Sequence, residues 1–354
     1  NIARLSPSST LGANKWVALV SSGYFPTDTL DPASNDPSAG QTSLLVIDLA
    51  TGTLLREIKT STAPEFVAGT TKTFGLSTPL VYDFGGDQTD NLAVAGDLAG
   101  NLWRFDLDQG KVNLMFQTYG NGGATSVGDQ PLASMPIALT DRVTRGPIFI
   151  VGTGKLLGRP DRTNNIPMQA YYGIRDYGTQ TSAGTYPVKV NQLISQAITE
   201  DGNGVRTLTN NQVPLANKGW RIPLNVAAEK GERSQRRAFP LYTANLAILY
   251  SVIPKGDDPC NPGNRYGVLV VGGSTGGLPP DDPSQPPAGI AGVVIDASTP
   301  LGSPVVRPGG RLVIPLPSDP PLPQVVIDAL NKLLDTASLQ WHRGEWRQLL
   351  DDNN

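Results

Sequence analysis

An acidic loop is the stretch of this 354-residue sequence most suited to chemistry. Asp83, Asp87 and Asn91 carry oxygen-bearing side chains at intervals along it, and Thr89 lies between the last two. Oxygen ligands at alternate positions, with backbone carbonyls in the gaps, let a short loop wrap a hard cation such as calcium. We therefore predict a calcium site made by these four residues.

The loop departs from the EF-hand pattern. Counted from Asp83, position 6 is Gln88 instead of glycine and position 12 is Val94 instead of glutamate. Asp90, beside the expected last ligand, can turn inward and supply a further oxygen. With so few carboxylates, the affinity for calcium should be weak, at about 10⁻⁴ to 10⁻³ M. The alternative is a solvated turn whose Asp and Asn side chains bind only their own backbone.

Short strands follow the loop, and one pair of them is repeated. Leu92 to Ala95 and the segment ending at Asp106 are predicted strands joined by a turn. Ser43 to Thr60 aligns without gaps on Asn101 to Thr118, at an offset of 58 residues, with Asp and Gly at matching turn positions. Each copy predicts a β-hairpin.

Other apolar runs extend this pattern and predict an all-β protein. They lie at Trp16 to Val20, Ile148 to Val151, Ala170 to Ile174, Ala244 to Val252 and Val268 to Val271. Four-stranded units of roughly 40 to 50 residues are typical of propeller blades. We predict an irregular β-propeller with about four recognisable blades, fewer than a closed ring needs unless further sequence supplies the rest.

Long stretches between the strands define the predicted organisation. Tyr24 to Thr42 and Asp176 to Arg221 are expected to be loop insertions, and residues 272–317 are rich in Gly and Pro, which predicts an extended loop. Gln324 to Leu334 has one apolar face and predicts a short helix. The predicted domains are a propeller over residues 1–317 and, over residues 318–354, a helix and closing strand that pack on it.

Composition excludes several functional classes. A net charge of -3, with no basic block, argues against nucleic-acid binding, and no apolar run is long enough for a transmembrane helix. One histidine, His342, and one cysteine, Cys260, argue against the common nucleophile–base pairs and against cysteine-rich zinc sites. Because the chain starts at Asn1 without a leader, we expect a targeting segment upstream.

A family resemblance rests on the run AGDLAGNLWRFDL, preceded by the acidic loop. It resembles the C-terminal domain of the PilC/PilY family of type IV pilus biogenesis and tip proteins, as do GLSTPLVYD, FIVGTGKLL and YYGIRD. The resemblance implies a non-enzymatic, calcium-binding propeller at the cell surface or pilus tip. Its implied partners are minor pilins or other tip components and a host or environmental surface ligand.

The family's acidic loop also differs from this one at one position. The family pattern has Asp or Asn at positions 1, 3, 5 and 9 and a carbonyl donor at 7, which falls on Thr89, whereas Gly85 occupies position 3 here.

Two other functional classes stay open. The hairpin repeat also resembles propeller dehydrogenases that use a quinone, although the residues that clamp the quinone cannot be placed, and a metal-free interaction scaffold would need no site at all.

Overall fold

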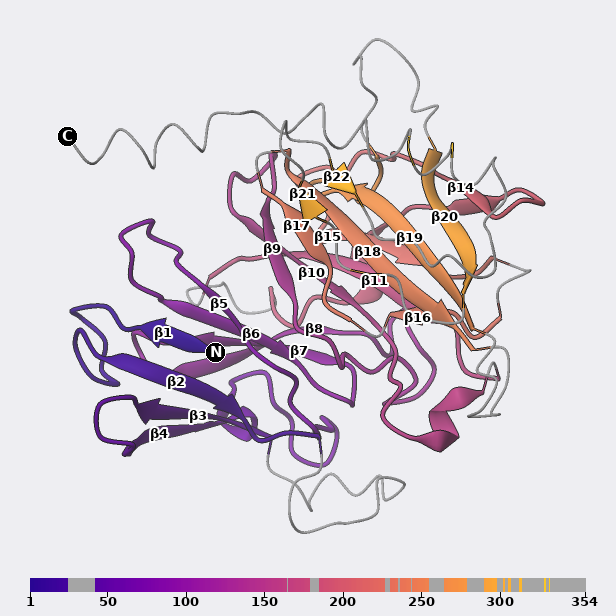
Figure 1. Ribbon diagram of the computed structural model, residues 1–354. Coiled ribbons are helices and arrows are strands. Elements are labelled where there is room, and N and C mark those ends of the chain that lie inside the picture. Colours follow the sequence, from indigo (N-terminus) through magenta and orange to yellow (C-terminus); the bar gives the residue numbers. More distant parts are fainter. Residues whose placement is uncertain are drawn as a thin grey trace, which may run out of the picture.

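Four β-sheets dominate the computed structural model of the chain (Figure 1). The structure describes residues 1–24, 42–163, 165–178, 185–226, 230–234, 236–242, 244–254, 264–278 and 290–297, with a few isolated positions beyond them. The secondary structure of these residues consists of strands and three short 3-10 helices: Thr60–Thr62, Arg159–Arg162 and Val190–Gln192. The predicted all-β class is therefore confirmed.

The first two sheets are consecutive four-stranded meanders. Sheet 1 has the strand order β1-β2-β3-β4 and sheet 2 the order β5-β6-β7-β8. Both hairpins of the 58-residue repeat form as predicted, β3–β4 and β7–β8, each with a left-handed glycine in its turn, Gly52 and Gly110. The strands are β1 (Ile2–Arg4), β2 (Trp16–Ser21), β3 (Ser43–Asp48), β4 (Leu54–Lys59), β5 (Leu80–Tyr82), β6 (Leu92–Gly96), β7 (Asn101–Asp106) and β8 (Lys111–Gln117).

Sheet 3 has five strands and takes two of them from the stretch that was expected to be a loop insertion. The order is β12-β15-β11-β10-β9, so β15 pairs with β11 and β12 pairs with β15. The prediction that Asp176 to Arg221 merely joins blades is wrong, because this stretch completes a sheet. The strands are β9 (Ile137–Thr140), β10 (Pro147–Gly152), β11 (Ala170–Arg175), β12 (Ile194–Ser195) and β15 (Gly219–Pro223).

Sheet 4 has the most strands, and it shows that a second prediction from the sequence was wrong. Its order is β13-β14-β20-β19-β18-β16, with β17 also paired to β18. Strand β20 lies inside the Gly/Pro-rich residues 272–317, yet it pairs with both β14 and β19, so a loop throughout that range is wrong. The strands are β13 (Ile198–Glu200), β14 (Val205–Leu208), β16 (Arg233–Ser234), β17 (Phe239–Leu241), β18 (Leu246–Ile253), β19 (Asn264–Gly272) and β20 (Ile290–Ala297).

The sheets are stacked face to face in chain order, with one apolar core between each pair. Leu44 and Val46 of sheet 1 share a core with Trp103 and Phe105 of sheet 2. The opposite face of sheet 2 shares a second core with sheet 3, in which the rings of Phe116 and Tyr172 lie 4.8 Å apart. Such consecutive stacking of meander sheets is the arrangement of propeller blades.

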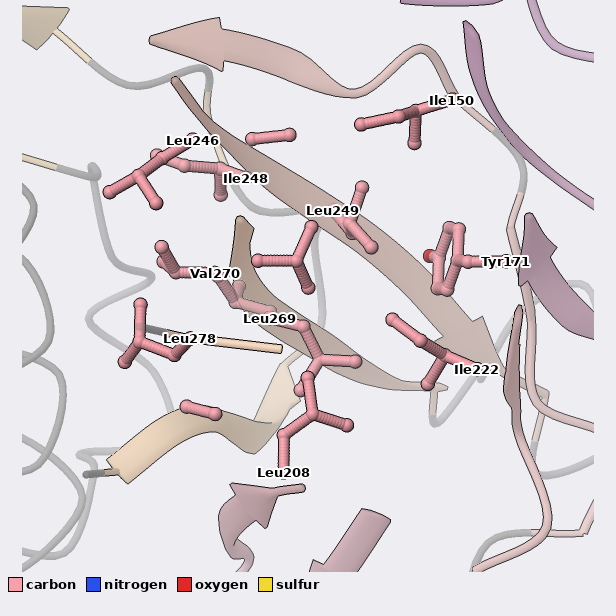
Figure 2. Packing of buried hydrophobic residues seen from close by; sticks show 14 of the residues in the cluster. Ile150, Tyr171, Leu208, Ile222, Leu246, Ile248, Leu249, Leu269, Val270 and Leu278 are labelled. Carbon is pink, nitrogen blue, oxygen red and sulfur yellow. The ribbon is translucent and has the colours of Figure 1, made fainter. Parts of the chain in front are cut away.

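The third core joins sheets 3 and 4. Figure 2 shows Ile150, Tyr171 and Ile222 of sheet 3 beside Leu249 and Leu269 of sheet 4. In Figure 1 the chain accordingly runs from sheet 1 at the lower left, through sheets 2 and 3, to sheet 4 at the upper right.

The C-terminal predictions have no support in this structure. Only Asp328 and Asn331 of the predicted helix Gln324 to Leu334 are described, and the predicted closing strand lies outside the described residues. Cys260 and His342 lie outside them as well. The last described elements are a two-stranded ribbon of β21 (Val305–Val306) and β22 (Leu312–Val313).

Candidate metal centre

The acidic loop is the connection between the first two strands of sheet 2. Strands β5 and β6 pair antiparallel, with Tyr82 opposite Leu92, so residues 83–91 form the hairpin loop between them. Gly86 and Gln88 have φ values of 68° and 66°, and these left-handed positions turn the chain back on itself. The loop is therefore coiled tightly enough for its side chains to meet.

Two of the three carboxylates in the loop, those of Asp83 and Asp87, accept hydrogen bonds from its backbone. Asp83 Oδ1 accepts from the N–H of Gly86 at 2.6 Å, and Asp83 Oδ2 accepts from the N–H of Gln88 at 2.8 Å. Asp87 Oδ1 accepts from the N–H of Thr89 at 2.9 Å and from its hydroxyl at 2.6 Å. These bonds fix the direction of both carboxylates, and they are also the contacts expected of a self-satisfied turn.

Three of the predicted ligands converge on one point. A Cβ atom built on Gly85 would lie 3.7 Å from Asp87 Cγ, 3.8 Å from Asp83 Oδ1 and 3.9 Å from Asn91 Oδ1. The side chain of the third loop position would therefore enter the middle of this group, where the family pattern has an Asp or Asn. The structure brings Asp83, Asp87 and Asn91 together, and the glycine leaves one ligand position without a side chain.

The side chains of Thr89 and Asp90 are both engaged in hydrogen bonds. The Thr89 side chain is buried, and its hydroxyl donates to Asp87, which leaves the Thr89 carbonyl as the group for the seventh position. Asp90 faces strand β1: its Oδ2 accepts from the N–H of Arg4 at 2.8 Å, and its own N–H donates to the Arg4 carbonyl at 2.7 Å. Asp90 is thus directed toward β1 in this structure, and its compensation for Gly85 stays a prediction.

The loop is anchored to its surroundings by residues that sequence reasoning missed. Asn91 Nδ2 donates to Asp108 Oδ2 at 3.1 Å, and the hydroxyl of Ser6 donates to Asp108 Oδ1. The N–H of Leu107 donates to the Asn91 carbonyl at 2.8 Å. The Asp106-x-Asp108 spacing at the end of β7 could have indicated this anchor, because it marks a second acidic turn in the sequence. The loop thus connects β1 with the β7–β8 turn.

The surroundings of the two aspartates Asp87 and Asp90 shift their pKa values in opposite directions. Hydrogen bonds, first from the Thr89 hydroxyl and then from the Thr89 N–H, lower the pKa of Asp87, whereas burial raises the pKa of Asp90. Among the described residues, no three His, Cys, Asp or Glu side chains form a metal-binding group. Two carboxylates, one amide oxygen and one carbonyl can hold a single hard cation weakly.

The match to a family model decides which proteins this chain is related to. The PilY1 beta-propeller domain model matches residues 7–211, which include sheet 1 except β1, all of sheet 2, most of sheet 3 and the acidic loop. The chain belongs to the PilY1 β-propeller family. The family resemblance predicted from the acidic loop and from the run that follows it is therefore confirmed.

Curated PilY1 proteins match the chain over about three-quarters of its length. The type IV pilus biogenesis factor PilY1 of Pseudomonas aeruginosa PAO1 is 30% identical over 303 residues, covering 74% of this chain and 24% of the relative. A PilY1 homolog of Xylella fastidiosa is 26% identical over 265 residues, covering 74% of this chain and 19% of the relative. The chain thus spans about a quarter or less of the length of these relatives.

A solved structure of the family has the same fold. The crystal structure of the Pseudomonas aeruginosa PilY1 C-terminal domain matches with a TM-score of 0.64 and 20% sequence identity. The match covers 89% of this chain and 69% of that one. Within the described residues, no helix has the length and apolar character required to cross a membrane.

Proposed function

We propose that this domain is a non-enzymatic, calcium-modulated propeller of a type IV pilus biogenesis protein. It would support pilus assembly, control of retraction and surface adhesion. The observation that carries the proposal is the convergence of Asp83, Asp87 and Asn91 around Gly85 in a PilY1-family domain. The relatives with the same domain are named as type IV pilus biogenesis factors.

Calcium would act through the anchors of the loop. Bringing Asp83 and Asp87 closer together raises their mutual repulsion, and a bound cation would offset it. The stiffened loop would then hold β1 through Asp90 and the β7–β8 turn through Asn91 and Asp108. Calcium would in this way strengthen the junction between sheets 1 and 2.

The proposed setting is the cell surface or the pilus tip. Minor pilins or other tip components would be the partners on the pilus, and a host or environmental surface ligand the partner outside it. A non-enzymatic role is supported by a sequence with one histidine and one cysteine, which leaves few means of assembling a nucleophile with its base. Co-purification of minor pilins with the full-length protein, and loss of pili on its deletion, would test this setting.

Calorimetric titration tests the calcium site. We expect calcium to bind the chelator-stripped protein at about 10⁻⁴ to 10⁻³ M and to raise its melting temperature, and Asp87→Ala to abolish both effects. Asp201→Ala is the matched control, because Asp201 also accepts hydrogen bonds from its own turn, from the N–H groups of Asn203 and Val205. Binding that survives Asp87→Ala, or is lost equally in Asp201→Ala, would contradict the assignment.

Restoring the absent ligand gives the complementary test. Gly85 is outside the left-handed region, so Gly85→Asp can be made without backbone strain and would direct a third carboxylate into the group. Because affinity follows the number of charged ligands, we expect binding about tenfold tighter. Gly85→Ala is the control and should not tighten binding. Equal affinities in the two variants would mean that no cation occupies this centre.

A further inference from the structure

Two segments that are far apart in the sequence carry a concentration of positive charge. Residues 155–162 and 230–237 together hold seven of the chain's 28 Lys and Arg residues and two of its 31 Asp and Glu residues, which gives them a net charge of +5. The net charge of the whole chain is -3. Neither segment stands out as a basic block in the sequence, because each is short and contains one acidic residue.

The fold places the two segments side by side. Strand β16 lies in the second segment, and the N–H of its Ser234 donates to the Thr153 carbonyl at 2.9 Å, just before the first segment. Gly154 permits this close approach, since a Cβ atom built on it would lie 2.5 Å from the Cβ atom of Arg233. Figure 1 shows the 3-10 helix Arg159–Arg162 as a coil at the lower right, below β16.

A buried arginine holds the segments together. Arg233 is 1% exposed, and its guanidinium donates to the carbonyls of Asp161, at 2.6 Å, and of Thr163. Within the described residues, its acceptors are all backbone carbonyl oxygens. Burial lowers the pKa of Arg233, but a guanidinium keeps its charge at neutral pH. This contact therefore fixes the geometry and adds a positive charge beneath the surface.

The two acidic residues of the segments are engaged within the fold. Glu232 is 1% exposed, and its Oε1 lies 2.7 Å from Nη1 of the buried Arg206. Asp161 Oδ2 accepts from the N–H of Leu157 at 2.8 Å, and its Oδ1 lies 3.6 Å from Lys155 Nζ. Arg206 thus offsets the charge of Glu232, and Lys155 offsets that of Asp161.

Four other basic side chains of these segments reach the surface. Lys230 and Arg237 are exposed, and Arg162 and Arg236 are partly exposed. The guanidinium of Arg236 lies 4.1 Å from the centre of the Tyr250 ring, and this cation–π contact fixes its direction. We call Arg162, Lys230, Arg236 and Arg237 the basic patch. Clustered charges of one sign raise the local concentration of oppositely charged ligands.

The composition of the basic patch favours a polysaccharide over other anionic polymers. Protein interfaces have apolar or aromatic anchors at their centre, but among the described residues of the two segments only Leu157 is a large apolar side chain with substantial exposure, 40%. A single-stranded nucleic acid needs aromatic faces for its bases, and Arg236 covers the ring of Tyr250. A polysaccharide with acidic groups needs only spaced cationic donors, which arginine supplies in pairs.

We propose that the basic patch binds an anionic polysaccharide, a polymer that carries carboxylate or sulfate groups. The proposal rests on the proposed function as a surface protein, and it gives the chemical class of the host or environmental ligand. Because the patch combines the β10–β11 connection of sheet 3 with the segment around β16 of sheet 4, both segments are needed for binding. The acidic loop of sheet 2 takes no part in it.

Titration with defined polymers tests the proposal. The 354-residue chain is titrated, with a chelator present, with heparin as the sulfated polymer, polygalacturonate as the carboxylated polymer and dextran as the uncharged control. We expect at least one anionic polymer to bind, about tenfold more weakly at about 200 mM salt than at about 50 mM, because salt screens the charges. The polymer that binds identifies the acidic group. Failure of both anionic polymers to bind, or equal binding of dextran, would overturn the proposal.

Charge reversal locates the binding surface. The double variant Lys230→Glu with Arg237→Glu should weaken binding at least about tenfold. The matched control is Arg56→Glu with Lys111→Glu, which changes the net charge equally at exposed positions of sheets 1 and 2 and should leave binding within about twofold. Unchanged melting temperatures show that both variants fold. Equal losses would mean that binding follows overall charge, and would overturn the proposal.

The first segment gives an independent test. Arg162→Glu should weaken binding at least about threefold, whereas Arg142→Glu, at an exposed position elsewhere on sheet 3, should not. Unchanged binding in Arg162→Glu would overturn the proposal, as would tighter binding of DNA or polyglutamate than of either polysaccharide. Calcium titration and pilin co-purification do not depend on these residues, so failure here is distinguishable from failure of the proposed function.

Discussion

Sheets 1 and 2 contain the two copies of one repeat, yet their surroundings differ. In sheet 2 every residue of β6 is buried, and so is every residue of β7 except Asp106. In sheet 1, β2 alternates between buried and more exposed positions, and β4 has one buried residue, Ile58. Equivalent hairpins thus fold in the same way whether one face or both are covered, which means that the hairpin is set by local sequence and its burial by its place in the stack.

The largest test of this comparison uses two tryptophans. Trp103 of sheet 2 is fully buried and donates to Asp97 at 2.8 Å, whereas Trp16 of sheet 1 is 57% exposed. In the 354-residue chain, Trp103→Ala should reduce the free energy of unfolding by about 3 to 5 kcal/mol. Trp16→Ala should change it by about 0.5 kcal/mol or less. Urea unfolding measures both, and similar costs would show that Trp16 is covered as well as Trp103 is.

A buried carboxyl group in sheet 2 predicts a dependence on pH. Asp97 is fully buried and accepts hydrogen bonds from the N–H and the side-chain amide of Asn101, the indole of Trp103 and the hydroxyl of Thr73. Burial raises its pKa from 3.8 to about 6. The folded state therefore binds this proton more tightly than the unfolded chain does, and stability should fall as pH rises from about 4 to 6.

The variant Asp97→Asn isolates this effect, because its side chain stays neutral. The free energy of unfolding of the wild-type protein should fall relative to the variant by at most about 1.4 kcal/mol per pH unit over that window. Above pH 6 the two curves should run parallel. Parallel curves from pH 4 to 6 would show that the hydrogen-bond donors, and not burial, decide the charge of Asp97.

The turn glycines of the two hairpins give the smallest test. Gly52 and Gly110 have φ values of 71° and 62°, so alanine at either position should cost about 1 kcal/mol. A Cβ on Gly110 would also lie 2.8 Å from Leu11 Cδ2, whereas nothing lies within 4 Å of one on Gly52. We expect Gly110→Ala to cost about 1 kcal/mol more than Gly52→Ala.

The control for this pair is Gly202→Ala, at a glycine outside the left-handed region with open space around it. It should change the free energy of unfolding by about 0.5 kcal/mol or less. Thermal unfolding of the three variants gives the ranking. Equal costs for Gly52 and Gly110 would mean that Leu11 moves aside freely and that the two turns are energetically the same.

The local features of the fold were predictable from sequence. Both hairpins follow from alternating apolar residues around an Asp-x-x-x-Gly turn, and the acidic loop follows from the spacing of its oxygens. Features set by distant residues were not predictable. Asp90 turns toward β1 because the Arg4 backbone lies beside it, and nothing near Asp90 in the sequence reveals that contact.

The sequence also did not reveal which strands belong to which sheet. Strand β20 lies in a Gly/Pro-rich stretch whose average composition predicts a loop, but Ile290–Ala297 is itself apolar and finds partners in β14 and β19. In the same way, β15 forms because β11 offers an open edge. An average over 46 residues conceals an eight-residue strand, and pairing between remote segments has no local signal.

The position of β20 also determines the order in which the chain can fold. Sheets 1 and 2 each close within contiguous sequence, because every strand in them pairs with the one next to it along the chain. Strand β14 cannot join sheet 4 until Ile290–Ala297 is present, more than 80 residues later in the chain. Such long-range pairing is slow. During synthesis, the half of the domain that contains the acidic loop can therefore be complete before sheet 4 closes.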